Sequence, residues 1–130
     1  MTLGINTTER EKIYLTLYGE KSEKCFSAKG GPAFGWEFET KNQSDDILLA
    51  IEGILKECKL SIQDIKAILV NRGPGSFTGV RVGITGGNAL AWVLNIPIFG
   101  YSQGKEKSTF EKIKKLKKTH FSKIALPYYE

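Results

Sequence analysis

The chain has 130 residues, of which 41% are hydrophobic and 25% are charged, a composition typical of one soluble globular domain. No run approaches the roughly 20 consecutive apolar residues that a membrane-spanning helix needs, and the first residues lack the pattern of a secretory signal. From these features we expect a cytoplasmic protein that does not contact the membrane.

The formal charge of +5 is concentrated at one end of the chain. Residues 104–130 contain eight lysines and three glutamates, whereas acidic and basic side chains are equal in number in residues 1–103. A lysine-rich segment can attract RNA through its phosphates. A solvated helix face explains the same lysines without RNA, so both interpretations stay open. The candidates for RNA contact are Lys112, Lys114, Lys115, Lys117 and Lys118.

The first forty residues have the pattern of β-strands. Leu3–Asn6 is a short apolar run that ends in polar residues suited to a turn. Apolar and polar residues then alternate over residues 13–18, and residues 24–28 can return as the next strand. A further alternation over residues 34–38 predicts a third or extended strand.

Helices and strands then alternate along the chain. Ser44 is a candidate N-cap for a helix with one apolar stripe that ends near Cys58, and Ser61 with Asp64 predicts a short capped turn. The continuous apolar run Ala67–Val70 is typical of a strand buried on both faces. We expect a helix over 79–94, a strand over 96–100, a basic helix over 109–118 and an extended segment over 124–129.

This order of elements predicts an α/β fold. Three antiparallel strands followed by helix–strand–helix–strand units fit one ribonuclease-H-like layer with a mixed sheet of five to six strands.

The helix over 79–94 carries an unusual stripe of small residues. Gly79, Gly83, Gly87 and Ala91 recur every fourth residue, and so they lie along one side of the helix. Each glycine costs roughly 1 kcal/mol in a helix relative to alanine. We therefore expect something to pack closely against this stripe, either the protein's own sheet or a helix of a partner.

The glycine-rich loop before that helix is a potential anion site, because amide groups and the helix dipole converge there. The nucleotide-binding fingerprints nevertheless fail, since Thr78 stands where both the Walker loop and the dinucleotide loop require glycine. A tight turn with Ser76 or Thr78 as the helix cap is the better interpretation.

Catalytic constellations are also missing from the sequence. His120 is the only histidine, and Asn6 stands where a ribonuclease-H-type nuclease needs a metal-binding carboxylate. Cys25 and Cys58 have no metal-ligand spacing, and we expect both to be reduced, buried side chains. The sequence therefore predicts a protein without catalysis of its own.

The segment from Arg72 to Ile84 closely resembles the signature of the TsaB family, the bacterial scaffold subunits for threonylcarbamoyladenosine synthesis on tRNA. The resemblance is good from about Gln43 to Ser102 and thin elsewhere. The residues of the signature loop are Arg72, Gly73, Pro74, Gly75, Ser76, Phe77, Thr78 and Arg81.

The resemblance implies an actin-like ATPase (ASKHA) fold that pairs with the related catalytic subunit TsaD through two helices, here 44–58 and 79–94. It also implies an assembly with a TsaE-like ATPase and tRNA, in which ATP and metal belong to the partners. Because a self-complementary helix stripe can pair with its own copy, we also expect a homodimer when the protein is alone. The glycine stripe would admit the partner's helix. The expected interface residues are Ile47, Ile51, Ile54, Gly79, Gly83, Gly87 and Ala91.

The chain departs from the family pattern at three places. Asn6-Thr7-Thr8 replaces Asp-Thr-Ser, and Gln43-Ser44-Asp45 replaces a His-Ser-Glu-like stretch. We also expect the family's second domain to be absent, so that residues 1–102 form the actin-like domain and residues 103–130 complete it with a helix and a strand. Two other functions stay open: a nucleotide hydrolase that uses the Gly73–Gly79 loop, and a small RNA-binding module.

Overall fold

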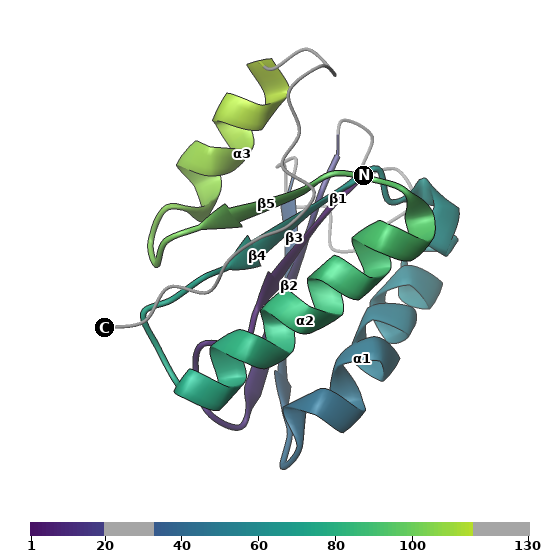
Figure 1. Ribbon diagram of the computed structural model, residues 1–130. Coiled ribbons are helices and arrows are strands. Elements are labelled where there is room, and N and C mark those ends of the chain that lie inside the picture. The colour runs from purple at the N-terminus through teal and green to yellow at the C-terminus, as the bar shows by residue number, and fades with distance from the viewer. Residues whose placement is uncertain (20–32, 116–130) are drawn as a thin grey trace.

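The computed structural model describes residues 1–19 and 33–115, and these form one α/β layer (Figure 1). No described helix is both long enough and apolar enough to cross a membrane. In chain order the elements are β1 (Thr2–Asn6), β2 (Lys12–Tyr18), β3 (Ala33–Glu39), α1 (Gln43–Glu57), the 3-10 helix η2 (Ile62–Asp64), β4 (Ala67–Asn71), α2 (Phe77–Leu94), β5 (Ile98–Tyr101) and α3 (Glu106–Lys115).

The described strands form one mixed sheet in the order β3-β2-β1-β4-β5. The pairs β1–β2 and β2–β3 are antiparallel, whereas β1–β4 and β4–β5 are parallel. Ile5 is central in this register, since it lies opposite Leu15 of β2 and Val70 of β4. The expected α/β fold with a mixed sheet is therefore confirmed, with five strands in the described residues.

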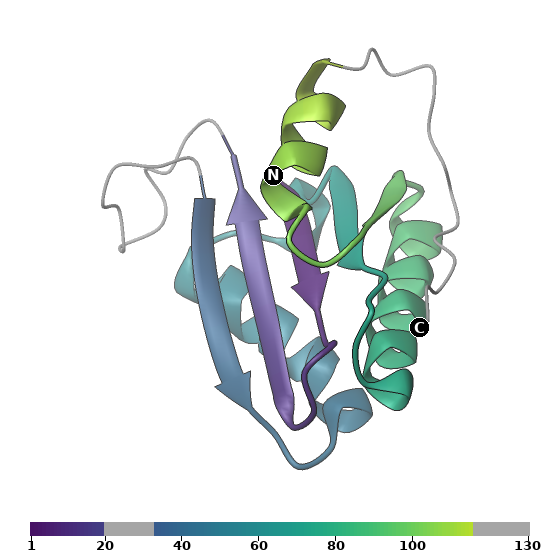
Figure 2. The same cartoon turned by 90° about the vertical axis from the view of Figure 1, so that its left-hand side faces the viewer.

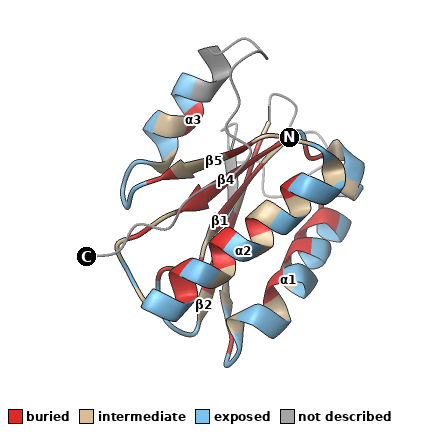
Figure 3. Ribbon diagram, viewed as in Figure 1, coloured by how far each residue is buried: buried red, intermediate tan, exposed pale blue. Residues whose placement is uncertain are grey.

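The main core lies between the sheet and the two helices α1 and α2, which cover the same face (Figure 1). Alternate residues of each strand point into it, because side chains of a strand alternate between the two faces. Burial follows the sheet-facing sides of both helices (Figure 3). The largest fully buried side chains of this core are Leu3, Ile5, Ile13, Leu15, Leu17, Ile51, Ile54, Ile65, Ile68, Val70 and Ile98.

A smaller cluster holds α3 on the opposite face, with β4 and β5 between α3 and α2 (Figure 2). Phe110 of α3 stacks on Tyr18 with 4.2 Å between the ring centroids. The hydroxyl of Tyr101 donates to the carboxylate of Glu106 at 2.9 Å. Burial, and then the negative charge of Glu106, raise the pKa of Tyr101, and burial followed by a hydrogen bond to Glu106 raises the pKa of Tyr18.

The expected elements appear with shifted boundaries. The predicted N-cap at Ser44 is wrong, because the side chain of Asn42 accepts from the backbone N–H of Asp45 at 3.2 Å and α1 begins at Gln43. Asn42 also accepts from the hydroxyl of Ser44, which is an exposed side chain in the first turn. The capping box of Ser61 and Asp64 is confirmed.

Other predictions are tested only where residues are described. The basic helix begins at Glu106 rather than Thr109. The strands predicted over 24–28 and 124–129 lie outside the described residues, and so does Cys25. Cys58 is buried in the main core as expected, but it is disulfide-bonded, so the prediction of a free thiol at this position is wrong.

Candidate docking groove and signature loop

The signature loop is a tight turn that leads from β4 into α2. Gly73 has a φ of 98°, a conformation that favours glycine, and its amide donates to the side-chain oxygen of Asn71 at 2.8 Å. The hydroxyl of Ser76 accepts from the amide of Gly79 at 3.2 Å and caps α2. The interpretation as a turn with Ser76 as the helix cap is therefore confirmed.

This loop packs directly on the turn that follows β1. The amide of Ser76 donates to the backbone carbonyl of Thr8 at 2.8 Å, and a Cβ on Gly75 would come within 2.6 Å of the Thr8 side chain. Thr8 in turn donates from its amide and its hydroxyl to Asn6, at 3.0 and 2.7 Å. The amides of Gly73, Ser76 and Gly79 thus donate within the protein.

The polar side chains at the ends of the parallel strands also bond to one another. The amide group of Asn71 donates to Gln103 at 2.6 Å, and the backbone N–H of Gln103 donates to the carbonyl of Gly73 at 3.0 Å. In the part of the chain that the structure describes, no three His, Cys, Asp or Glu side chains form a metal-binding group.

The glycine stripe of α2 faces the protein's own sheet, so the expectation that a partner helix packs against it is wrong. A Cβ on Gly83 would lie 2.5 Å from the hydroxyl of Thr7, and one on Gly87 would lie 3.1 Å from Ile98 of β5. Gly79 lies against the backbone of Thr7 in the same way. The glycines let α2 approach the sheet closely, which is the other alternative that the sequence left open.

The remaining expected interface residues are buried for the same reason. Ile51 and Ile54 of α1 and Ala91 of α2 are at most 2% exposed and belong to the main core. Ile47 is also in the core, although it forms part of the floor of the groove between the two helices. Of the seven expected interface residues, a partner in the groove could therefore reach Ile47, whereas the other six face the protein's own core.

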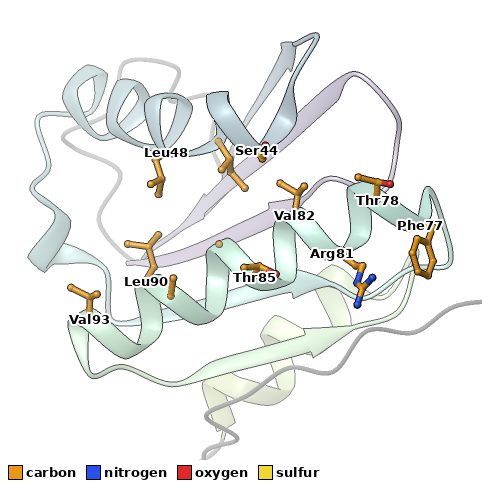
Figure 4. A pocket seen from close by; sticks show the side chains of 12 residues that line it. Ser44, Leu48, Phe77, Thr78, Arg81, Val82, Thr85, Leu90 and Val93 are labelled. Atoms are coloured by element: carbon orange, nitrogen blue, oxygen red, sulfur yellow. The ribbon is translucent and has the colours of Figure 1, made fainter.

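The exposed side of the two helices instead forms an apolar groove of about 540 Å³ (Figure 4). Leu48 is 58% exposed and lies across the groove from Leu90, while Phe77 and Val93 project at its two ends. The described lining residues are Ser44, Ile47, Leu48, Phe77, Thr78, Arg81, Val82, Thr85, Gly86, Ala89, Leu90 and Val93.

The groove continues past both ends of this central section. Leu48 and Leu90 also line a hollow of about 430 Å³ that extends to Leu60 and Ile62. At the other end, Ser44, Thr78 and Val82 are shared with a more polar hollow of about 340 Å³. Together these make a long surface across α1 and α2.

The sequence contained a signal for this groove that the glycine stripe obscured. Val82, Gly86, Leu90 and Val93 are spaced three or four residues apart and form a second, partly apolar stripe of α2. Two stripes on one helix indicate two packing partners. The sheet takes the glycine stripe, and the second stripe faces α1 and lines the groove.

Of the candidate RNA-contact lysines, the structure describes the side chain of Lys112 alone, which is exposed on α3. Lys114 and Lys115 belong to the same helix, but their side chains are not described. Lys117 and Lys118 lie outside the described residues.

The sheet order, the two helices on one face and the polar ends of the parallel strands define an α/β domain of the actin-like (ASKHA) class. The family model described as TsaD, tRNA N6-adenosine threonylcarbamoyltransferase, matches residues 36–105. The chain therefore belongs to this family, and its similarity to proteins named TsaB and YeaZ makes it a TsaB-like member.

Two curated relatives are named tRNA threonylcarbamoyladenosine biosynthesis protein TsaB. The protein from Bacillus subtilis is 45% identical over 62 residues, which are 48% of this chain and 27% of the relative. The protein from Escherichia coli is 39% identical over 67 residues, which are 52% of this chain and 29% of the relative. A tRNA N6-adenosine threonylcarbamoyltransferase from Geotalea daltonii is 39% identical over 64 residues, which are 49% of this chain and 19% of the relative.

Among solved structures, YeaZ from Pseudomonas aeruginosa is similar with a TM-score of 0.64 and 27% identity, over 78% of this chain and 44% of that one. The chain thus spans less than a third of the length of these curated relatives and less than half of this solved structure.

Proposed function

We propose that this protein is a non-catalytic scaffold subunit that dimerises with a TsaD-like threonylcarbamoyltransferase and supports threonylcarbamoyl transfer to the adenosine next to the tRNA anticodon. The observation that carries the proposal is the apolar groove across α1 and α2. The groove lies between α1 and α2, the two helices through which the family resemblance implies pairing with TsaD. The proposed contact is on the exposed sides of these helices, whereas the residues expected from the sequence lie on their buried sides.

The composition of the groove supports a protein partner. Burying an exposed Leu, Val or Phe side chain gains roughly 1.5–3 kcal/mol, and Leu48, Phe77 and Val93 are all largely exposed along one surface. A contiguous apolar surface of this kind marks an interaction site more often than a scattered set of apolar residues does. Helices of a partner that fill the groove would complete a four-helix arrangement.

The geometry of the strand ends supports a subunit without catalysis and without a nucleotide of its own. In open α/β sheets, ligands bind beyond the carboxyl ends of the strands. Here that position is taken by bonds among Asn6, Thr8, Asn71 and Gln103, and the amides of Gly73 and Ser76 are used within the fold. This arrangement disfavours the alternative of a nucleotide hydrolase at the Gly73–Gly79 loop.

The rest of the proposed assembly follows from the family. ATP and metal belong to the TsaD-like subunit and to a TsaE-like ATPase, tRNA joins through the complex, and the cytoplasm is the setting. When the TsaD-like subunit is absent, the same apolar groove pairs with a second copy of the chain.

Neighbouring leucines of α1 provide a matched test. Leu48 and Leu49 are 58% and 66% exposed, but only Leu48 lines the groove. In binding measurements with the purified TsaD-like subunit of the same organism, Leu48→Asp should abolish association and Leu49→Asp should leave it intact. Equal binding by both folded variants would rule out the groove as the interface, and no binding by the unmodified chain would reject the proposed function.

A further inference from the structure

A single arginine stands at one end of the apolar groove. Among the described residues that line its central section, Arg81 is the one charged side chain. Its guanidinium lies over the ring of Phe77, 5.1 Å from the centroid (Figure 4). Among the described residues, no carboxylate forms an ion pair with the guanidinium of Arg81. The ion pair found in this part of the chain joins Lys12 to Glu37.

The surroundings of Arg81 add positive charge. The polar hollow that shares Ser44, Thr78 and Val82 with the groove is lined by Arg10 and Lys41, against one acidic residue, Glu11. Asp45 and Asp46 in the first turn of α1 line neither hollow. The opposite end of the groove carries Glu52 together with Lys56, which balance each other.

Docking on the groove would remove water from Arg81. A guanidinium that loses its water without gaining an acceptor is strongly unfavourable, whereas a carboxylate can accept two of its N–H groups side by side. We infer that the protein partner docked on this groove presents an aspartate or glutamate carboxylate that pairs with Arg81. The inference rests on the proposed function. It adds which chemical group the partner presents to the groove, and at which end of the groove that group lies.

A second copy of the chain fits this requirement less well than a different protein. The acidic side chain that lines the far end of the groove is Glu52, and Lys56 lies one turn further along the same helix, where it can pair with Glu52. Glu11 shares its hollow with two cationic side chains, Arg10 and Lys41. We therefore assign the carboxylate to the TsaD-like subunit.

The test measures the dissociation constant of the full chain for the purified TsaD-like subunit. Arg81→Met retains the length of the side chain and removes its charge, and it should raise the dissociation constant roughly thirty-fold. Arg81→Lys should recover part of this loss, since a point charge cannot form the paired hydrogen bonds. Lys107→Met removes an exposed charge from α3 and should change nothing.

A charge exchange identifies the acceptor. Arg81→Glu should abolish binding, and reversing one acidic residue of the partner to arginine should restore it. If no reversal restores binding, or if Arg81→Met binds like the unmodified chain while Leu48→Asp fails to bind, the inference is overturned and the groove remains the interface. If Glu52→Gln weakens self-association as much as Arg81→Met does and neither changes binding to the partner, the carboxylate belongs to a second copy and the inference is also overturned.

Discussion

The backbone carbonyl oxygen of Thr7 occupies the space in which a β-carbon on Gly79 would lie. Thr7 follows β1, and Gly79 is in the first turn of α2, so this contact joins two segments that are far apart in the sequence. The hydroxyl of Thr7 also donates to the carbonyl of Gly79. The start of α2 is therefore held against the end of β1 by backbone as well as side-chain contact.

Two glycines of α2 should respond oppositely to the same substitution. Gly79→Ala should lower the free energy of unfolding by roughly 2 kcal/mol or more, because the backbone of Thr7 cannot move away without disturbing β1. Gly86→Ala should raise it by roughly 0.5–1 kcal/mol, since its Cβ would meet only Ile47 at an ordinary 3.5 Å. Urea unfolding of the two variants measures this. Equal stability would contradict the packing of the stripe on the sheet.

Gln43 should contribute to stability through three backbone carbonyls. Its side-chain amide lies within hydrogen-bonding distance of the carbonyls of Thr7, Glu9 and Lys12, at 3.1, 3.0 and 2.8 Å. Gln43→Leu should lower the free energy of unfolding by roughly 1–3 kcal/mol, because partly buried acceptors would be left without their donor. The exposed Gln63 of η2 is the control, and Gln63→Leu should be near neutral.

Stability should fall in strongly alkaline solution because of Tyr18 and Tyr101. Burial raises the pKa of both hydroxyls above the ordinary value near 10, so the folded state keeps protons that the unfolded state releases. Their contribution is complete below pH ~10 and is lost as pH rises, by up to roughly 1.4 kcal/mol per pH unit for each tyrosine. Tyr101→Phe should flatten this decline in urea unfolding measured from pH 9 to 11. An unchanged slope would contradict the assignment.

Calorimetric titration of the protein with ATP and magnesium should show no saturable heat. The amides of Gly73, Ser76 and Gly79 each donate within the fold, so a phosphate could accept from these three only by displacing existing bonds. Saturable binding that disappears after Gly75→Val would favour the nucleotide hydrolase instead.

The lysine-rich segment provides a separate test of RNA binding. Replacing Lys112, Lys114, Lys115, Lys117 and Lys118 with glutamine should weaken the binding of tRNA to the assembled complex and reduce its dependence on salt. The logarithmic salt slope should become shallower by about 0.7–0.9 for each phosphate that a lysine no longer neutralises. Replacing the exposed Lys56 and Lys66 is the control. A salt slope that survives the first replacement would assign the lysines to a solvated face.

Local patterns were sufficient to predict much of this molecule. The alternation over residues 13–18, the apolar run at 67–70 and the capping pair Ser61 and Asp64 all depend on neighbours in the sequence, and each is present as expected. The end of α1 and the cap at Ser76 have the same local origin. The N-cap Asn42 was missed because Ser44 offered an equally good local signal two residues later.

The direction in which the glycine stripe faces could not be decided in this way. Gly79, Gly83 and Gly87 require a close neighbour, but a stripe of small residues is the same whether a sheet or a foreign helix fills it. The parallel pairing of β1 with β4 and of β4 with β5 carries Thr7, Ile5 and Ile98 beneath α2, and these contacts join residues distant in the sequence. The sequence by itself thus determined the elements and the need for close packing, whereas the tertiary structure decided which surface of α2 stays exposed.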